Sequence, residues 1–238
     1  AGKLLNAGKD VAKAVTLNDE EIARLSRESV EWMDANNPVA ADSTTYGARL
    51  KRLTEGITDA DGLPLNFKVY LVTDVNAFAC GDGSIRVFAA LMDLMDDDEL
   101  MAIIGHEIGH VVHADTKHAM KNAYLASAAR NAAGAAEGSA LARLSESQLG
   151  KVVATFTDAQ FSQKPEYEAD EHGFEFCVKH GFDPYGMANS LDKLVELSKG
   201  AKASTVQKMF SSHPDSEKRA ARMKEKADAY MAAQRQNR

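Results

Sequence analysis

The chain has 238 residues and a formal net charge of −7, a length that allows one domain with a sizeable hydrophobic core. The acidic balance excludes an electrostatic nucleic-acid binder, because phosphate recognition needs a clustered cationic face. No stretch of 18 apolar residues occurs, so we expect no transmembrane segment in this chain.

The first part of the chain predicts two helices followed by a small sheet. Asn18 precedes apolar residues at helical spacing and can cap a helix. The tract 62–64, Gly-Leu-Pro, is expected to break the structure before the first strand. Glycines 81 and 83 are placed to form the turn of a β-hairpin. The expected elements are helices over 18–36 and 43–57, a strand over 67–72, and a hairpin of 76–79 with 85–88.

From residue 89 onward the sequence is expected to form helices and loops. A small sheet packed against many helices is an α+β arrangement. We predict one domain over residues 1–238, with 1–17 as a leader and 215–238 as a C-terminal helix. The expected helices cover 97–115, 116–135, 146–161, a segment opened by Pro165, 184–198, 204–210 and 215–235.

Residues 106–110 read His-Glu-Ile-Gly-His within one of these helices. Residues i and i+4 share one face of a helix, so His106 and His110 can offer two imidazole nitrogens to one metal ion. Glu107, one position round, would reach the open coordination position. Two ligands leave the site incomplete, because a catalytic zinc takes three protein ligands and a water.

The third ligand is predicted in the run Glu-Tyr-Glu-Ala-Asp at 166–170. Glu166 and Asp170 are also i and i+4 on a helix, so both carboxylates face one direction. Glu166 can complete the zinc site, and Asp170 can accept a hydrogen bond from the far ring nitrogen of His106. Glu168 and Glu171 are the competing carboxylates, but Glu168 points about 200° away from Glu166 on the helix.

Two more polar residues of the motif helix have alternative interpretations. Glu99 lies two turns before His106 on the same face. It would either support the metal ligands from outside or be a first-turn acid that the helix dipole favours. His113 shares the face but lies a turn beyond the metal, so we expect a packed or hydrogen-bonded histidine.

Together the motifs resemble a known family of peptidases. Residues 105–110 and 166–170, followed by Ser-His-Pro at 212–214, look like the gluzincin family of the CAAX prenyl proteases, HtpX and BepA, which is peptidase family M48. The resemblance is greatest to the outer-membrane lipoprotein proteases of the LoiP (YggG) type and covers roughly residues 60–220. The other stretches that look like the LoiP type are 68–70, 74–79, 85–87 and 161–163.

The resemblance implies a mostly helical, zincin-type metalloprotease domain, with the small sheet packed on the active-site helix and one Zn²⁺ per chain. It implies an endopeptidase in which Glu107 takes a proton from a zinc-activated water and returns it to the leaving amine. His213 and Arg219 are candidate donors to the developing oxyanion. In some relatives this histidine is thought to occupy the water's position, so His213 is expected to be either a donor or a self-inhibiting ligand.

The substrate is expected to bind along residues 76–79. If this segment is the sheet edge beside the motif helix, an extended polypeptide can add to it as another strand. An ordinary buried hairpin strand is the alternative. The four residues concerned are Asn76, Ala77, Phe78 and Ala79. The chain lacks the hydrophobic segments that membrane-embedded relatives carry between the two motifs, which excludes prenyl-protein processing.

The chain departs from the family pattern at one position near the motif. The family often has a histidine five residues after the second ligand, but this chain has Asp115 there, with His113 and His118 nearby. The role of that histidine therefore cannot be transferred. Cys80 and Cys177 have no metal-ligand spacing and could be free thiols or one disulfide.

The resemblance places the protein in the periplasm, acting on unfolded or misassembled polypeptides. The chain starts with Ala rather than Met, so a lipid anchor to the outer membrane could precede residue 1. One alternative function is a chaperone-like or self-inhibited zinc-binding module in which His213 plugs the metal site. Another is an exopeptidase, which would need a charged group to hold a substrate terminus, and none is identifiable. The sequence does not predict the oligomeric state.

Overall fold

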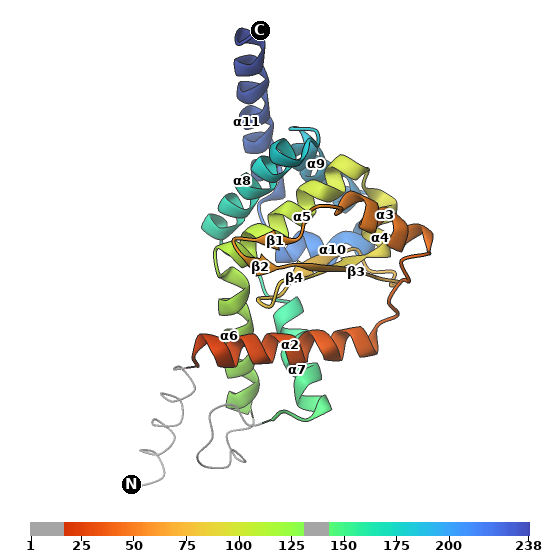
Figure 1. Cartoon of the computed structure of the whole chain (residues 1–238), viewed down its shortest axis with the longest axis vertical. Helices are drawn as coiled ribbons and strands as arrows, with labels where there is room; N and C mark the ends of the chain where they lie inside the picture. Colours follow the sequence, from red (N-terminus) through yellow and green to blue (C-terminus); the bar gives the residue numbers. More distant parts are fainter. Residues whose placement is uncertain (1–16, 131–142) are drawn as a thin grey trace.

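The computed structural model describes residues 17–130 and 143–238, which are mostly helical with two small sheets (Figure 1). The α+β prediction is therefore confirmed. The leader and the end of the helix expected over 116–135 fall mainly outside the described residues. None of the helices described is long and apolar enough to cross a membrane.

The helices are α2 (Asp19–Asn36), α3 (Thr45–Leu53), α4 (Ala89–Leu94), α5 (Asp97–Val112), α6 (Asp115–Arg130), α7 (Glu146–Thr157), α8 (Gln163–His180), α9 (Gly186–Lys199), α10 (Ala203–Ser212) and α11 (Ser216–Gln236). The strands are β1 (Asp59–Ala60), β2 (Leu63–Pro64), β3 (Asn66–Tyr70), β4 (Ala77–Ala79) and β5 (Ser84–Phe88).

The larger sheet has the strand order β3-β5-β4. Its antiparallel pair β4–β5 is the predicted hairpin, whereas the parallel pairing of β3 with β5 was not predicted. The hairpin turn requires glycine at Gly83, where φ is +91° and a Cβ atom would lie 2.0 Å from the carbonyl oxygen of Pro64. In this strand order β4 is one of the two edge strands, as the expected substrate site at 76–79 requires.

The segment between α3 and β3 differs from the prediction. The helix expected over 43–57 ends at Leu53, because Gly56 has a φ of +81° that a right-handed helix cannot contain. The tract 62–64, expected to be only a break, contributes strand β2, which pairs with β1 across Asp61 and Gly62. Both turn residues have positive φ, and Asp and Gly tolerate that conformation well.

Helix α5 lies at the centre of the molecule, above the sheet in Figure 1, with α8 and α9 against its other side. It begins with a capping box, in which Asp96 and Glu99 each accept the other's backbone N–H. Its residues from Glu99 to Val111 are all buried. It ends at Val112, three residues earlier than predicted, because Ala114 has a φ of +63°.

The hydrophobic core has separate clusters on the two faces of the sheet. Val87 and Ile104 belong to the cluster between the sheet and α5. On the other face, α2, α6 and α7 pack beneath the sheet (Figure 1), where Phe78 of β4 meets Phe156 of α7 edge to face. This second cluster also contains Cys80. Cys177 belongs to a third cluster, and both cysteines are free and buried.

An ion pair with a buried arginine ties α2 to the sheet. The side chain of Arg86 on β5 is 2% exposed, and its Nε lies 2.9 Å from Asp34 Oδ1 while Nη2 lies 3.0 Å from Oδ2. Tyr70 on β3 donates a hydrogen bond of 2.6 Å to the same carboxylate. Burial opposes ionisation of Asp34, but the hydrogen bonds from Arg86 and Tyr70 outweigh it and lower its pKa.

Candidate metal centre

Helices α5 and α8 approach each other closely because glycines line their contact. A Cβ atom added at Gly109 of α5 would lie 2.8 Å from the Cβ of His172. One added at Gly173 of α8 would lie 2.8 Å from the carbonyl oxygen of Ala102. Real Cβ atoms do not approach so closely, so only glycine permits this separation. The close approach brings the two sequence motifs together.

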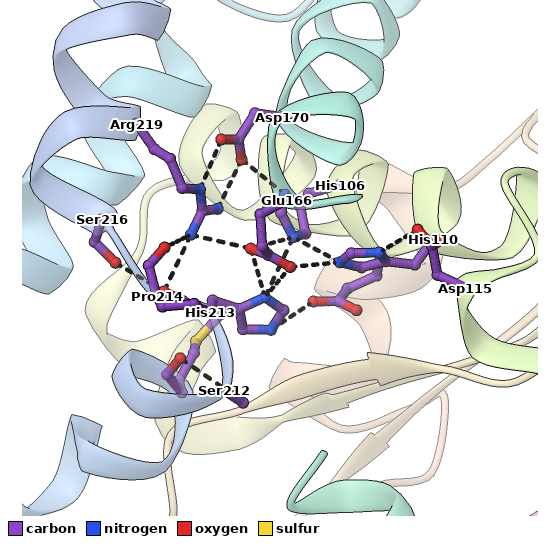
Figure 2. Close-up of polar contacts among 12 residues, drawn as sticks. His106, His110, Asp115, Glu166, Asp170, Ser212, His213, Pro214, Ser216 and Arg219 are labelled. Carbon is purple, nitrogen blue, oxygen red and sulfur yellow. Dashed lines mark hydrogen bonds and ion pairs between the residues drawn. The ribbon is translucent and has the colours of Figure 1, made fainter. Parts of the chain in front are cut away.

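Four side chains converge where these helices meet the connection between α10 and α11 (Figure 2). Ligand atoms of His106, His110, Glu166 and His213 all lie within 4.8 Å of one another, and all four residues are buried. His110 Nε2 lies 2.9 Å from Glu166 Oε1, and His106 Nε2 lies 3.4 Å from Oε2. His213 Nδ1 lies 3.0 Å from Glu166 Oε2 and 3.3 Å from His106 Nε2.

The outer nitrogens of the first two histidines face carboxylates. His106 Nδ1 lies 2.9 Å from Asp170 Oδ1, and His110 Nδ1 lies 2.9 Å from Asp115 Oδ2. An ionised carboxylate only accepts hydrogen bonds, so each Nδ1 donates its proton outward and each Nε2 is the nitrogen left to bind a cation at the centre. These two Nε2 atoms are 3.1 Å apart. A cation between them would be bound by both Nε2 atoms and by the Glu166 carboxylate.

The spacing of these atoms fits zinc. With bonds of about 2.0–2.1 Å, adjacent ligand atoms of a tetrahedral zinc lie roughly 3.3 Å apart. The distances from Glu166 to His110 and His106, 2.9 and 3.4 Å, and the 3.1 Å between the histidines lie around this value. A set of imidazole nitrogens and one carboxylate is also the donor chemistry that zinc prefers.

The pKa shifts of the group show an excess of negative charge. Burial would lower the pKa of His106, but the charge of Glu166 and the hydrogen bond to Asp170 raise it to about 9. Burial is likewise outweighed at His213, whose pKa is raised to about 10 by Glu166 and Glu107. Burial opposes the charge on Glu166, yet the neighbouring histidines hold its pKa well below the ordinary value. A bound cation would stabilise the same carboxylates in place of the protons on the histidines.

Glu107 lies beside this group and is 3% exposed. His213 Nε2 is 3.2 Å from its Oε1, close enough for an ion pair, but Oε1 receives no aligned hydrogen bond. Burial would raise the pKa of Glu107, and His213 with the two other histidines lowers it. The carboxylate is therefore ionised with an acceptor site unused.

Arg219 of α11 lies behind the carboxylates and is 2% exposed. Its Nε and Nη2 donate to the two oxygens of Asp170 at 2.7 Å each. Its Nη1 lies 3.0 Å from Glu166 Oε2 and donates to the carbonyl oxygens of His213 and Pro214. Arg219 thus holds Asp170, Glu166 and the Ser-His-Pro segment in one arrangement.

Three residues considered in the sequence analysis contact other parts of the structure and not the four converging side chains. Glu99 caps the start of α5 and lies 2.5 Å from Lys193 of α9. Glu168 is paired with Lys164 on the outer face of α8. His113 is exposed, with its ring 6.4 Å from that of His172. The predicted substrate segment, Asn76, Ala77, Phe78 and Ala79, is buried at the edge of the sheet, against α5.

Two residues near His110 were not singled out as site residues by the sequence. Asp115 holds its outer nitrogen, and the ring of Phe161 stacks on it at a centroid distance of 4.0 Å and an interplanar angle of 18°. Asp115 is five positions from His110 and in another helix, so helical periodicity cannot reveal the pair. In the sequence, only the departure from the family pattern drew attention to Asp115. Phe161 lies in a family-like stretch, without an indicated role.

Comparisons with known proteins agree with this geometry. The model of peptidase family M48 matches residues 46–227. Metalloprotease LoiP of Escherichia coli (strain K12) is 37% identical over 227 residues, which are 95% of this chain and 88% of LoiP. Metalloprotease YcaL of the same organism is 36% identical over 223 residues, covering 93% and 86%. The beta-barrel assembly-enhancing protease of Escherichia coli (strain K12) is 29% identical over 182 residues, covering 72% of this chain and 37% of that protein. This chain therefore belongs to peptidase family M48 and is a metalloprotease.

Proposed function

We propose that the protein is a zinc-dependent endopeptidase that hydrolyses peptide bonds of unfolded or misassembled proteins. His106, His110 and Glu166 would hold one zinc ion per chain. The observation that carries this proposal is the convergence of the Nε2 atoms of two histidines on the Glu166 carboxylate, with Glu107 beside them. The family membership supports the same reaction.

Bound zinc lowers the pKa of a water toward about 7 and polarises the scissile carbonyl. Glu107 would accept the proton of the attacking water and later deliver it to the leaving amine nitrogen. Its lowered pKa keeps it ionised, as a general base requires. His213, whose Nε2 faces Glu107, is the better candidate for the oxyanion donor. Arg219 already donates to Asp170 and two carbonyl oxygens, so we assign it to positioning these groups.

We further propose that the substrate adds to the outer edge of β4 at residues 76–79. The position of β4 at the edge of the sheet and against α5 supports this proposal. Binding through backbone hydrogen bonds makes little demand on substrate side chains and suits unfolded chains. A relative named for enhancing β-barrel assembly agrees with a role on misassembled proteins. The resemblance to LoiP favours a periplasmic location, with an outer-membrane lipid anchor upstream of residue 1.

A second candidate is a self-inhibited or chaperone-like module. His213 Nδ1 belongs to the same group of potential ligand atoms and lies 3.0 Å from Glu166. It could therefore take the fourth zinc position in place of water, so that binding of polypeptides would matter more than cleavage.

The test measures zinc content and proteolysis on the same samples. Wild-type protein should hold one zinc per chain and cleave casein, and Glu107→Gln should keep the zinc and lose cleavage. Glu168→Gln, a change of an exposed carboxylate on α8, is the matched control and should keep both. A zinc-loaded wild type that cleaves no protein would reject the endopeptidase.

The same assay separates the remaining alternatives. If His213→Ala raises the rate of cleavage, His213 is an inhibitory ligand. If the substitution lowers the rate while zinc is retained, His213 is a donor to the oxyanion. Mass spectra with internal cuts support an endopeptidase, whereas ladders from one terminus indicate an exopeptidase.

A further inference from the structure

His110 is held from outside the group by the residue five positions later in the chain. Its Nδ1 lies 2.9 Å from Asp115 Oδ2 (Figure 2). The His110 side chain is fully buried, and that of Asp115 is 14% exposed, so water competes little for this hydrogen bond. The contact joins the end of α5 to the first residue of α6.

A strained turn produces this contact. Only His113 and Ala114 separate α5 from α6, and Ala114 has a φ of +63°. The left-handed conformation costs a non-glycine residue roughly 1–2 kcal/mol. The other non-glycine residues with positive φ in the described ranges are both aspartates, Asp61 and Asp215, a residue type that tolerates it better. Ala114 has no such compensation, and its conformation turns the chain so that Asp115 faces His110.

Asp115 differs from its counterpart on the other histidine. Asp170 accepts from His106 and is also bound by both ends of the Arg219 guanidinium. Among the described residues, Asp115 has His110 as its only side-chain partner. Its negative charge is therefore not shared with a cation and acts on the imidazole alone. Such a carboxylate fixes the tautomer of a ligand histidine and raises its basicity.

Phe161 restrains the same ring in a different direction. Its ring lies parallel to that of His110, at 4.0 Å between centroids. The stack covers one face of the imidazole, while the Asp115 hydrogen bond fixes its rotation within the plane. His110 is thus oriented by contacts from α6 and from the segment before α8, independently of Glu166.

We propose that Asp115 is a positioning residue that sets the metal affinity of the site by holding His110 with its Nε2 directed at the metal. This inference rests on the proposed zinc site and not on the identity of the substrate. The competing explanation is that Asp115 is only a first-turn acid, which stabilises α6 through the helix dipole. The two explanations differ in whether the loss of Asp115 changes zinc affinity or the stability of the metal-free protein.

The test measures the zinc dissociation constant by chelator competition and the melting temperature of the metal-free protein. Asp115→Ala should raise the dissociation constant by about 10–100-fold. Asp115→Asn keeps an acceptor oxygen and should raise it less. The matched control is Glu146→Ala, because Glu146 is the exposed acid at the same first position of α7 and has no contact with the metal group. It should leave zinc affinity unchanged.

An unchanged dissociation constant in Asp115→Ala, with a lower melting temperature, would overturn the proposal in favour of the helix role. If Asp115→Ala does not fold, Asp115→Asn decides: it must weaken zinc binding and change the visible spectrum of the cobalt-substituted protein, or the proposal is wrong. Zinc binding without proteolysis in the wild type would refute the proposed endopeptidase and leave this test intact. A wild type that binds no zinc would overturn both.

Discussion

The separation of α5 and α8 provides a sharp test of how the fold builds the metal centre. In Gly109→Ala, the new Cβ atom would lie 2.8 Å from the Cβ of His172, whereas ordinary contacts begin at 3.4 Å. The obstacle is next to the backbone of α8 and cannot rotate away. The two helices must therefore separate by about 0.6 Å at this point.

The energetic cost of this separation can be compared with its geometric effect. Overpacking costs about 1–3 kcal/mol, and alanine regains about 1 kcal/mol through its higher helix propensity. We expect a net loss of up to about 2 kcal/mol, or up to roughly 8 °C in melting temperature for a chain of this size. The displacement of Glu166 matters more, because about 0.6 Å is three times the roughly 0.2 Å tolerance of a zinc–ligand distance. Zinc affinity should fall by more than about tenfold.

Chelator competition and thermal unfolding of the metal-free protein measure the two effects separately. Gly200→Ala is the control, since a Cβ atom there comes no closer than 3.9 Å to any neighbour. Gly173→Ala should resemble Gly109→Ala, because it forces the same helices apart from the α8 side. Wild-type zinc affinity and activity in Gly109→Ala would refute the link between helix separation and ligand geometry.

Three other predictions concern stability, thiols and metal removal. Asp34→Asn leaves the buried Arg86 without its anion and should lower the free energy of unfolding at pH 7 by roughly 3 kcal/mol in urea titrations. Because the folded-state pKa of Asp34 is lowered, its contribution to the free energy of unfolding is present above about pH 4 and is lost as the pH falls through that pKa. A difference in unfolding free energy between wild type and Asp34→Asn that stays constant to about pH 3 would contradict this. Burial raises the pKa of Cys177 to about 12 and that of Cys80 well above its ordinary value, so a thiol reagent at pH 8 should find no reactive thiol in folded protein and two per chain after denaturation. Chelation should lower the melting temperature through the loss of linked binding energy, and an unchanged value would argue against a metal in the native state.

Local sequence rules predicted the features that depend on neighbours along the chain. The i, i+4 spacing of His106 with His110, and of Glu166 with Asp170, follows from the geometry of one helix. The cap at Asn18 also forms as expected, since its side chain accepts from the backbone N–H of Glu21. These interactions span at most four residues, so no knowledge of the tertiary structure was needed.

The features that were missed depend on contacts between distant segments or on a single backbone angle. The parallel pairing of β3 with β5 depends on side-chain packing that the strand pattern does not encode. Glu99 meets Lys193, which is 94 residues away on another helix. Asp115 reaches His110 only through the positive φ of Ala114, a conformation that alanine rarely adopts.

The depth at which the metal group lies also determines how fast a metal ion can exchange. The side chains of His106, His110 and Glu166 are at most 4% exposed, and that of His213 is 8% exposed. A chelator in solution cannot contact a metal enclosed in this way, so the protein must first open, as it must also do to admit a polypeptide substrate. At high chelator concentration the rate of zinc loss should therefore become independent of that concentration and equal to the rate of opening. The limiting rate of metal exchange would then measure how often the protein opens around the metal centre.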